Sequence, residues 1–148
     1  YPELGLLQKT AELQTALVAF SPVGRSLLTD KPHEANKVAG LSFLQDNPRF
    51  NEPNLSANIK ATHSFRNLAK DLGITAAGLS IAWLLYRGNQ VIPIPGTRSV
   101  DHLKEMAKGA EITLSKSDLL EIDKCLPVGW AHGDRYSSYQ WNGPEKYC

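Results

Sequence analysis

The chain has 148 residues, of which 42% are hydrophobic and 21% are charged. This is ordinary for a folded domain, and the length suffices for one domain with its own core. The net charge of +1 does not indicate a surface that binds nucleic acid or an anionic membrane. No apolar run approaches the ~20 residues that span a bilayer. We therefore expect one folded domain with neither nucleic acid nor a membrane as its partner.

The cysteine content indicates a reducing compartment. Cys125 falls inside a helical pattern and Cys148 is the last residue, so the sequence shows no disulfide framework. A cytoplasmic location is the resulting expectation. His33, His63 and Cys125 have no partners at metal-ligand spacing, and no metal site is predicted.

The first elements read as a helix followed by a strand. Leu4, Leu7 and Ala11 share a face of a helix expected over residues 3–14. Residues 16–20 form a short apolar run, which predicts a buried strand that ends at Ser21-Pro22. A glycine turn, Val23-Gly24-Arg25-Ser26, follows that strand directly.

Two long stretches carry no sustained period. Residues 29–58 are rich in Pro, Asn, Asp and Gly, and we predict a long functional loop or lid there. Residues 127–148 are expected to form a C-terminal tail without secondary structure.

Between these stretches the pattern is helical. Phe65, Leu68, Ala69 and Leu72 predict a helix that Gly73 ends. A second helix is expected after the cap residue Thr75, with one face made by Leu79, Ala82, Trp83 and Tyr86.

The second strand is predicted at Val91–Ile94, where a short apolar run precedes Pro95-Gly96-Thr97-Arg98. Ser99 can cap the helix that follows, whose predicted stripe is Leu103, Met106, Ala107 and Ala110. A strand, a glycine turn and a helix N-terminus in this order favour an anion, because free N–H groups and the helix dipole both attract negative charge. The alternative is an ordinary loop with an exposed arginine.

The order of elements predicts the α/β class with a parallel sheet. After the second strand, Ser115 and Asp118 resemble a capping box that opens a last helix through Cys125. Two strands alone cannot cover both faces of a parallel sheet. We therefore expect this chain to be the end of a larger fold.

Four segments, read together, resemble the C-terminal part of the aldo-keto reductases, and the similarity covers nearly the whole of residues 1–148. They are Phe20-Ser21-Pro22-Val23-Gly24-Arg25, Pro48-Arg49-Phe50, Ile92-Pro93-Ile94-Pro95-Gly96-Thr97-Arg98 and Gly133-Asp134-Arg135-Tyr136. The resemblance implies a (β/α)₈ barrel, of which the two strands would be the seventh and eighth. It also implies NADPH as cofactor and a small aldehyde or ketone as substrate. Phosphate often binds after these two strands in such barrels.

The resemblance assigns cofactor contacts to particular residues. Phe20 would lie flat against the nicotinamide, where the family usually has Tyr. The pyrophosphate would contact Ser21, Val23, Gly24 and Arg25, and the 2′-phosphate Gly96, Thr97 and Arg98. His102 would lie beside the adenine ribose and Glu105 near the adenine amino group. Met106 replaces the usual Asn.

Each of these residues also has a simpler interpretation. Phe20 could belong to the core, and Arg25 could be a solvated surface charge. His102 and Glu105 could lie on an exposed helix face.

The resemblance also implies that the catalytic Asp, Tyr, Lys and His come from earlier strands, so no catalytic residue is assigned here. Hydride transfer to a carbonyl needs an acid for the developing alkoxide, and this segment alone is not expected to catalyse. Two hypotheses follow: the cofactor-binding portion of an NADPH-dependent reductase, with an N-terminal barrel segment as partner, or a non-catalytic remnant that binds nucleotide or protein.

Overall fold

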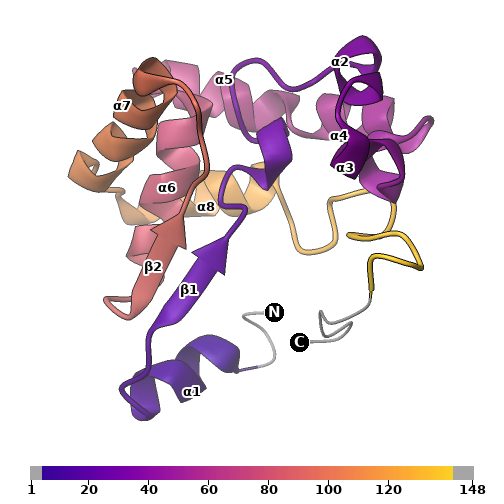
Figure 1. Ribbon diagram of the computed structural model, residues 1–148. Helices are drawn as coiled ribbons and strands as arrows, with labels where there is room; N and C mark the ends of the chain where they lie inside the picture. The colour runs from indigo at the N-terminus through magenta and orange to yellow at the C-terminus, as the bar shows by residue number, and fades with distance from the viewer. Residues whose placement is uncertain (1–4, 142–148) are drawn as a thin grey trace.

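The computed structural model describes residues 5–141. Its sheet has two parallel strands, β1 (Leu17–Phe20) and β2 (Val91–Ile94), in the register that pairs Leu17 with Val91 and Phe20 with Ile94. The strands lie side by side in Figure 1, with both carboxyl ends at the same edge. The predicted parallel pairing is confirmed.

Eleven helical segments are present in residues 5–141, eight α-helices and three short 3₁₀ helices. In chain order they are α1 (Leu6–Glu12), η2 (Gly24–Ser26), α2 (Ala35–Ala39), α3 (Ser42–Gln45), η3 (Pro48–Phe50), α4 (Asn54–Ala61), α5 (His63–Asp71), α6 (Ala76–Tyr86), α7 (Val100–Lys108), η4 (Gly109–Glu111) and α8 (Lys116–Cys125).

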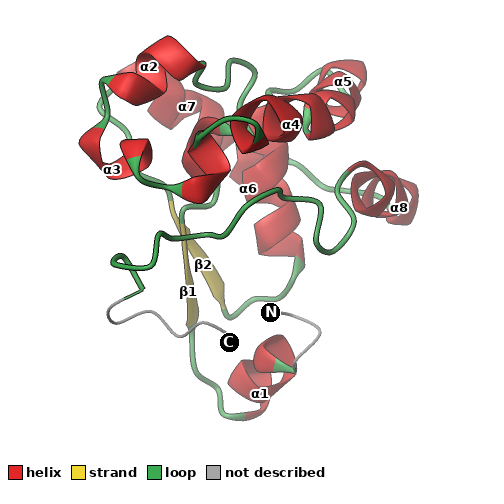
Figure 2. Cartoon of the chain, turned by 90° about the vertical axis from the view of Figure 1, so that its right-hand side faces the viewer, coloured by secondary structure: helices red, strands yellow, loops and turns green. Residues whose placement is uncertain are grey.

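Helices cover one side of the sheet, and the other side is open. The side chains that alternate toward the open face are about half exposed: Val18 53%, Phe20 48%, Ile92 49% and Ile94 50%. Val91, which precedes Ile92 and pairs with Leu17, is buried and lies on β2, the strand that contacts α6. Figure 2 shows the two strands with the helices gathered toward one side. Four apolar side chains therefore form one continuous surface on the open face.

The central element is α6, which is apolar and buried over its first seven residues. The main core joins it to α5 and α8 through Phe65, Ala69, Leu79, Leu114 and Ile122. A Cβ added at Gly109 would lie 2.5 Å from the Gly78 carbonyl oxygen. Glycine at this position therefore lets η4 pack directly on the backbone of α6.

The local signals that end or begin helices are confirmed. Gly73 has a φ of +71° after α5. The Thr75 hydroxyl accepts from the Gly78 amide at the start of α6, and Ser99 accepts from His102 at the start of α7. Ser115 and Asp118 form the reciprocal capping box of α8.

The prediction of one long loop over residues 29–58 is wrong. This stretch contains α2, α3 and η3 and begins α4. Its apolar side chains form a second core made of Leu27, Val38, Leu44, Phe50 and Leu55. Helices of four or five residues carry too few apolar positions to show a period, and tertiary packing stabilises them.

Two predicted apolar faces are less buried than expected. Within the described residues α1 spans Leu6–Glu12 rather than 3–14, and none of its residues is buried. On α7 only Met106 of the predicted stripe is buried, and Leu103 is 53% exposed. Both helices lie at the edge of the described structure, where they have few neighbours.

The tail, as far as residue 141, contains no helix or strand, as predicted, but it is packed against the rest of the chain. Asn58 Nδ2 donates to the His132 carbonyl at 3.0 Å, and the His132 N–H donates to Asn58 Oδ1 at 2.7 Å. Figure 1 shows this yellow segment running beside α3 and α4. Residues 142–148 lie outside the described residues.

In the part of the chain that is described, no helix taken singly has the length and apolar character to cross a bilayer. The segments Asn54–Asp71 and Ala76–Tyr86 meet both criteria only as a pair, across a bend of 89°.

Candidate functional site

The two glycine turns meet at the carboxyl ends of the strands and line one cavity of about 590 Å³, which we call the turn cavity. Six of the ten residues predicted from the sequence line it: Val23, Arg25, Gly96, Thr97, His102 and Glu105. The rest of its wall is made of Ser26, Thr29, Asp30, Lys31, His33, Leu44, Ala77 and Met106. Two segments far apart in the sequence thus build one site at the edge where parallel β/α proteins bind their ligands.

The other four predicted residues do not line the turn cavity. Phe20 ends β1 and is 48% exposed, so the alternative that it belongs to the core is wrong. Ser21 is exposed and has a φ of 53°, and its carbonyl accepts from the Gly24 amide at 2.9 Å. Gly24 also has a positive φ, of 58°. Arg98 is exposed on the loop before α7.

The second glycine turn is open toward a ligand. An added Cβ at Gly96 would meet nothing within 4 Å. The Thr97 hydroxyl accepts from the Ser99 amide at 3.1 Å, and the Ser99 hydroxyl accepts from the His102 amide at 3.3 Å. The start of α7 is therefore ordered beside empty space, which suits a loop that receives an anionic group.

Arg25 is not a solvated surface charge. Its backbone has a φ of 53°, a conformation that costs energy for a residue other than glycine. Its Nη1 donates to the Arg135 carbonyl at 3.2 Å, and its Cζ lies 4.7 Å from the Phe43 ring centre and 4.8 Å from that of Tyr136. Burial lowers the pKa of the Arg25 guanidinium, and the charge of Arg135 lowers it further, while Tyr136 opposes the shift.

Arg135 brings a second guanidinium to the same end of the sheet. Its Cζ lies 4.5 Å from the ring centre of Phe20 and 5.6 Å from that of Tyr136, which is 8% exposed. Its carbonyl accepts from the buried Asn47 side chain at 2.7 Å. Arg135 belongs to one of the four segments that resemble the family, but no role was predicted for it from the sequence. No local pattern indicates that the tail returns to β1.

Sequence reasoning also missed the cavity wall that η2 and the next residues supply. The His33 amide donates to the Ser26 hydroxyl at 2.9 Å, which folds this segment back on itself. Burial, and then the charge of Lys37, lower the pKa of His33, and the neutral imidazole is favoured. The available signal was position alone, since Ser26 ends the first glycine turn and Thr29 lies three residues further on.

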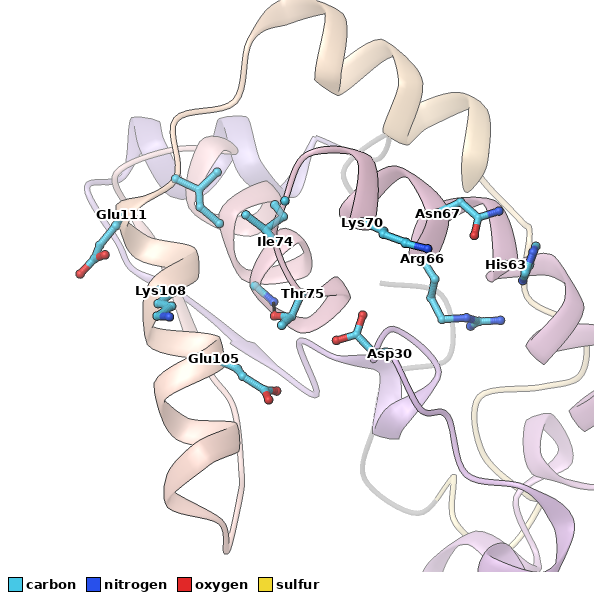
Figure 3. Close-up of a pocket in the computed structure, with 13 residues that line it drawn as sticks. Asp30, His63, Arg66, Asn67, Lys70, Ile74, Thr75, Glu105, Lys108 and Glu111 are labelled. Atoms are coloured by element: carbon cyan, nitrogen blue, oxygen red, sulfur yellow. Dashed lines mark hydrogen bonds between the residues drawn. The ribbon is translucent and has the colours of Figure 1, made fainter.

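A larger groove of about 930 Å³, which we call the outer groove, adjoins the turn cavity through Asp30 and Glu105. Figure 3 shows these two acidic residues on opposite sides of the groove, with Lys70 and Arg66 on α5 and Lys108 on α7. Asp30 Oδ1 accepts from the Ala76 amide at 3.0 Å, which ties the loop after η2 to the start of α6.

The outer groove carries mixed charge, and Glu105 is the only one of the ten predicted cofactor-binding residues that lines it. The guanidinium of Arg66 is engaged with the Thr62 hydroxyl at 2.6 Å and the Ile59 carbonyl at 2.7 Å. Burial lowers the pKa of Arg66, and Asp30 opposes that shift. The turn cavity is therefore the better candidate for a cofactor, although it is the smaller of the two.

Over residues 5–141 there is no group of three or more His, Cys, Asp or Glu side chains placed to hold a metal ion.

Comparison with known proteins identifies the family. Residues 2–127 match the model of the Aldo/keto reductase family. A probable aldo-keto reductase 1 from Glycine max is 37% identical over 125 residues, which cover 84% of this chain and 36% of that protein. The aldo-keto reductase yakc [NADP(+)] of Schizosaccharomyces pombe is 30% identical over 135 residues, covering 91% of this chain and 40% of that protein.

Solved structures show the same relationship. The thermostable aldo-keto reductase Tm1743 is 29% identical with a TM-score of 0.56, over 84% of this chain and 35% of that one. The glycerol dehydrogenase AKR11B4 from Gluconobacter oxydans, at 22% identity, shares the fold with a TM-score of 0.68, over 84% of this chain and 38% of that one. The chain belongs to the aldo/keto reductase family of oxidoreductases. It spans well under half the length of these relatives.

Proposed function

We propose that this chain is the cofactor-binding, C-terminal portion of an NADPH-dependent aldo-keto reductase that reduces aldehydes or ketones to alcohols. In this proposal β1 and β2 are the seventh and eighth strands of the barrel. The observation that carries it is the convergence of two glycine turns on one cavity at the carboxyl ends of parallel strands. The relative from Schizosaccharomyces pombe, whose printed name includes NADP(+), supports the choice of cofactor.

Each predicted residue then has a binding role. The half-exposed ring of Phe20 would stack on the nicotinamide. Ser21, Val23, Gly24 and Arg25 would line the pyrophosphate, and Gly96, Thr97 and Arg98 the 2′-phosphate. His102 would lie beside the adenine ribose, and Glu105 near the adenine amino group. When bound, the cofactor would supply the hydride, and these residues would hold and orient the cofactor.

The proton donor for the reaction would come from an N-terminal barrel segment, which we propose as the partner of this chain. The intact mass of the native protein tests this. A polypeptide of more than twice this length, or a tight complex with a second chain, supports the proposal. A native protein of 148 residues alone would instead favour a non-catalytic remnant that binds nucleotide or protein.

Arg98 provides the sharper test of cofactor choice. It is exposed beside the open turn at Gly96, and a charge-assisted contact with the 2′-phosphate is worth about ten- to a hundredfold in affinity. In the protein of full native length, Arg98→Ala should weaken NADPH binding by that factor and leave NADH nearly unchanged. The measurement is a fluorescence titration with both cofactors at fixed ionic strength, since salt screens such contacts.

The matched control is Arg87→Ala, which removes an arginine outside the turn cavity. The Cζ of Arg87 lies 4.4 Å from the ring centre of Trp83, at the end of α6. An equal loss for both cofactors would assign Arg98 to the shared pyrophosphate. No loss for either would return it to the class of solvated loop arginines.

A further inference from the structure

Five side chains form an alternating stack of arginines and rings at the end of β1. In order they are Phe43, Arg25, Tyr136, Arg135 and Phe20, and each guanidinium carbon lies 4.5–5.6 Å from the centres of its two neighbouring rings. Stacking occupies the flat faces of a guanidinium and leaves its N–H edges available for hydrogen bonds in the plane. The stack therefore orients Arg135 without using its donors.

The backbone of Arg135 is fixed from two sides. Its carbonyl accepts both from Asn47 Nδ2 at 2.7 Å and from Arg25 Nη1 at 3.2 Å. Asn47 is fully buried, so the first of these bonds is shielded from water. Arg135 is consequently a preorganised group although it belongs to a segment without secondary structure.

The positive charge of this stack is not neutralised within the described residues. The ion pairs over residues 5–141 are Lys9–Glu12 and Lys124–Glu121, and neither involves Arg25 or Arg135. Two guanidinium groups held around one tyrosine without a carboxylate favour an anion from outside this part of the chain.

That anion could come from the cofactor phosphates or from the substrate, and the position of Arg135 decides between these two sources. Arg25 lines the turn cavity, where the cofactor phosphates are proposed, whereas Arg135 does not line it. Arg135 lies instead on the ring of Phe20, which would stack on the nicotinamide. With the nicotinamide stacked on Phe20 as proposed, the edge of Arg135 would lie nearer to the reacting carbonyl than to the phosphates.

We propose that Arg135 is a substrate-recognition residue that binds a carboxylate carried by the aldehyde or ketone substrate. A planar guanidinium fork matches a carboxylate with two parallel N–H···O bonds. The assignment rests on the proposed function, since it uses the place of the nicotinamide on Phe20. It narrows the substrate to an oxo acid.

The test compares 4-formylbenzoate with its methyl ester, two aldehydes that differ at one end in charge. In the protein of full native length, Arg135→Gln should lower kcat/KM for the acid by about ten- to a hundredfold, the value of a charge-assisted hydrogen bond. The loss should fall mainly on KM, because the contact is made equally in the ground state and the transition state. The ester should be nearly unaffected, and Arg135→Lys should retain part of the preference.

Two further measurements keep the result interpretable. Arg87→Gln removes an arginine that stacks on Trp83 in the turn before β2, at the opposite end of the strands from Phe20, and should change kcat/KM for neither aldehyde. The NADPH dissociation constant of Arg135→Gln, from fluorescence titration, should equal that of wild type. A loss of NADPH affinity would place Arg135 on the cofactor phosphates, and an equal loss for acid and ester would make its effect structural. Either result overturns the substrate-binding role of Arg135 and leaves the proposed function standing.

Failure of the proposed function has a different signature. If wild type binds no NADPH and reduces neither aldehyde, the proposed function is overturned, and the role of Arg135 with it.

Discussion

Ser115 and Asp118 hold the start of α8 through reciprocal hydrogen bonds. The Ser115 amide donates to Asp118 Oδ2 at 2.8 Å, and the Asp118 amide donates to Ser115 Oγ at 3.2 Å. The hydroxyl of Ser115 also donates to Asp118 Oδ2 at 2.7 Å. These bonds favour the charged carboxylate, and they lower the pKa of Asp118 from its ordinary value of 3.8.

The pH dependence of this cap follows from the sign of that shift. Because the pKa is lower in the folded state, the stabilisation is complete above pH 3.8 and is lost as the pH falls through the lower folded value. In the protein of full native length, Asp118→Ala should therefore lower the urea midpoint at pH 6 and have a smaller effect below pH 3.8. Asp123→Ala, on the same helix outside its first turn, is the control. An Asp118→Ala effect that is constant with pH would contradict this account.

For individual residues, the sequence was informative where a feature depends on near neighbours. The caps at Thr75, Ser99 and Ser115 were predictable because each involves groups three positions apart. The orientation of Arg25 was not, since its hydrogen-bond partner Arg135 is 110 positions away. No local pattern reports such a contact.

At the scale of elements, Asn58 attaches the tail to α4. Its side chain is fully buried, and it donates to the carbonyls of Arg49 at 2.9 Å and His132 at 3.0 Å while accepting from the His132 amide at 2.7 Å. Every polar atom of the amide is thus used. Arg49 Nε also donates to the Gly133 carbonyl at 3.2 Å, so two residues hold one short stretch of the tail.

Removing this amide should release the tail. Asn58→Ala removes three hydrogen bonds to part-buried backbone groups, at a cost of about 1–3 kcal/mol in the free energy of unfolding. We expect faster proteolytic cleavage within residues 127–141 of the native protein, measured by mass spectrometry of timed digests. Asn67→Ala, at an exposed position on α5, should leave the cleavage rate unchanged. Equal rates for wild type and Asn58→Ala would show that other contacts hold the tail.

The elements themselves were predictable where their apolar residues are contiguous or periodic. The apolar runs of β1, β2 and α6 gave clear patterns, and all three were placed correctly to within one or two residues. In α2 and α3 only Val38 and Leu44 are buried, and one buried residue makes no period. The six predicted residues that line the turn cavity came from the family resemblance, which carries spatial information that periodicity lacks.

For the molecule as a whole, the open face of the sheet is the main unsatisfied surface among residues 5–141. Val18, Phe20, Ile92 and Ile94 are each about half exposed on one face, and each of the two strands has a neighbour on one edge only. Exposed apolar faces and unpaired edges favour association.

The 148-residue chain produced alone should therefore self-associate, bind a hydrophobic dye and unfold without one cooperative transition. Light scattering, dye fluorescence and calorimetry measure these properties. Ile92→Lys should reduce the association, because it places a charge on the open face, whereas Val128→Lys should not, since Val128 lies in the tail and is 83% exposed. A monodisperse monomer with a single sharp transition would mean that the chain satisfies its own surfaces.

The pairing of β1 with β2 has a consequence for the order of events during synthesis. Leu17 pairs with Val91 and Phe20 with Ile94. During synthesis β1 therefore leaves the ribosome before α2 to α6, and it cannot pair with β2 until β2 has also emerged. At about 5–20 residues per second, that wait lasts for several seconds, whereas a helix forms in about a microsecond. The helical segment between the strands therefore has time to fold first. Throughout that interval the edge of β1 that pairs with β2 has no partner, which makes this apolar segment a candidate site for a chaperone.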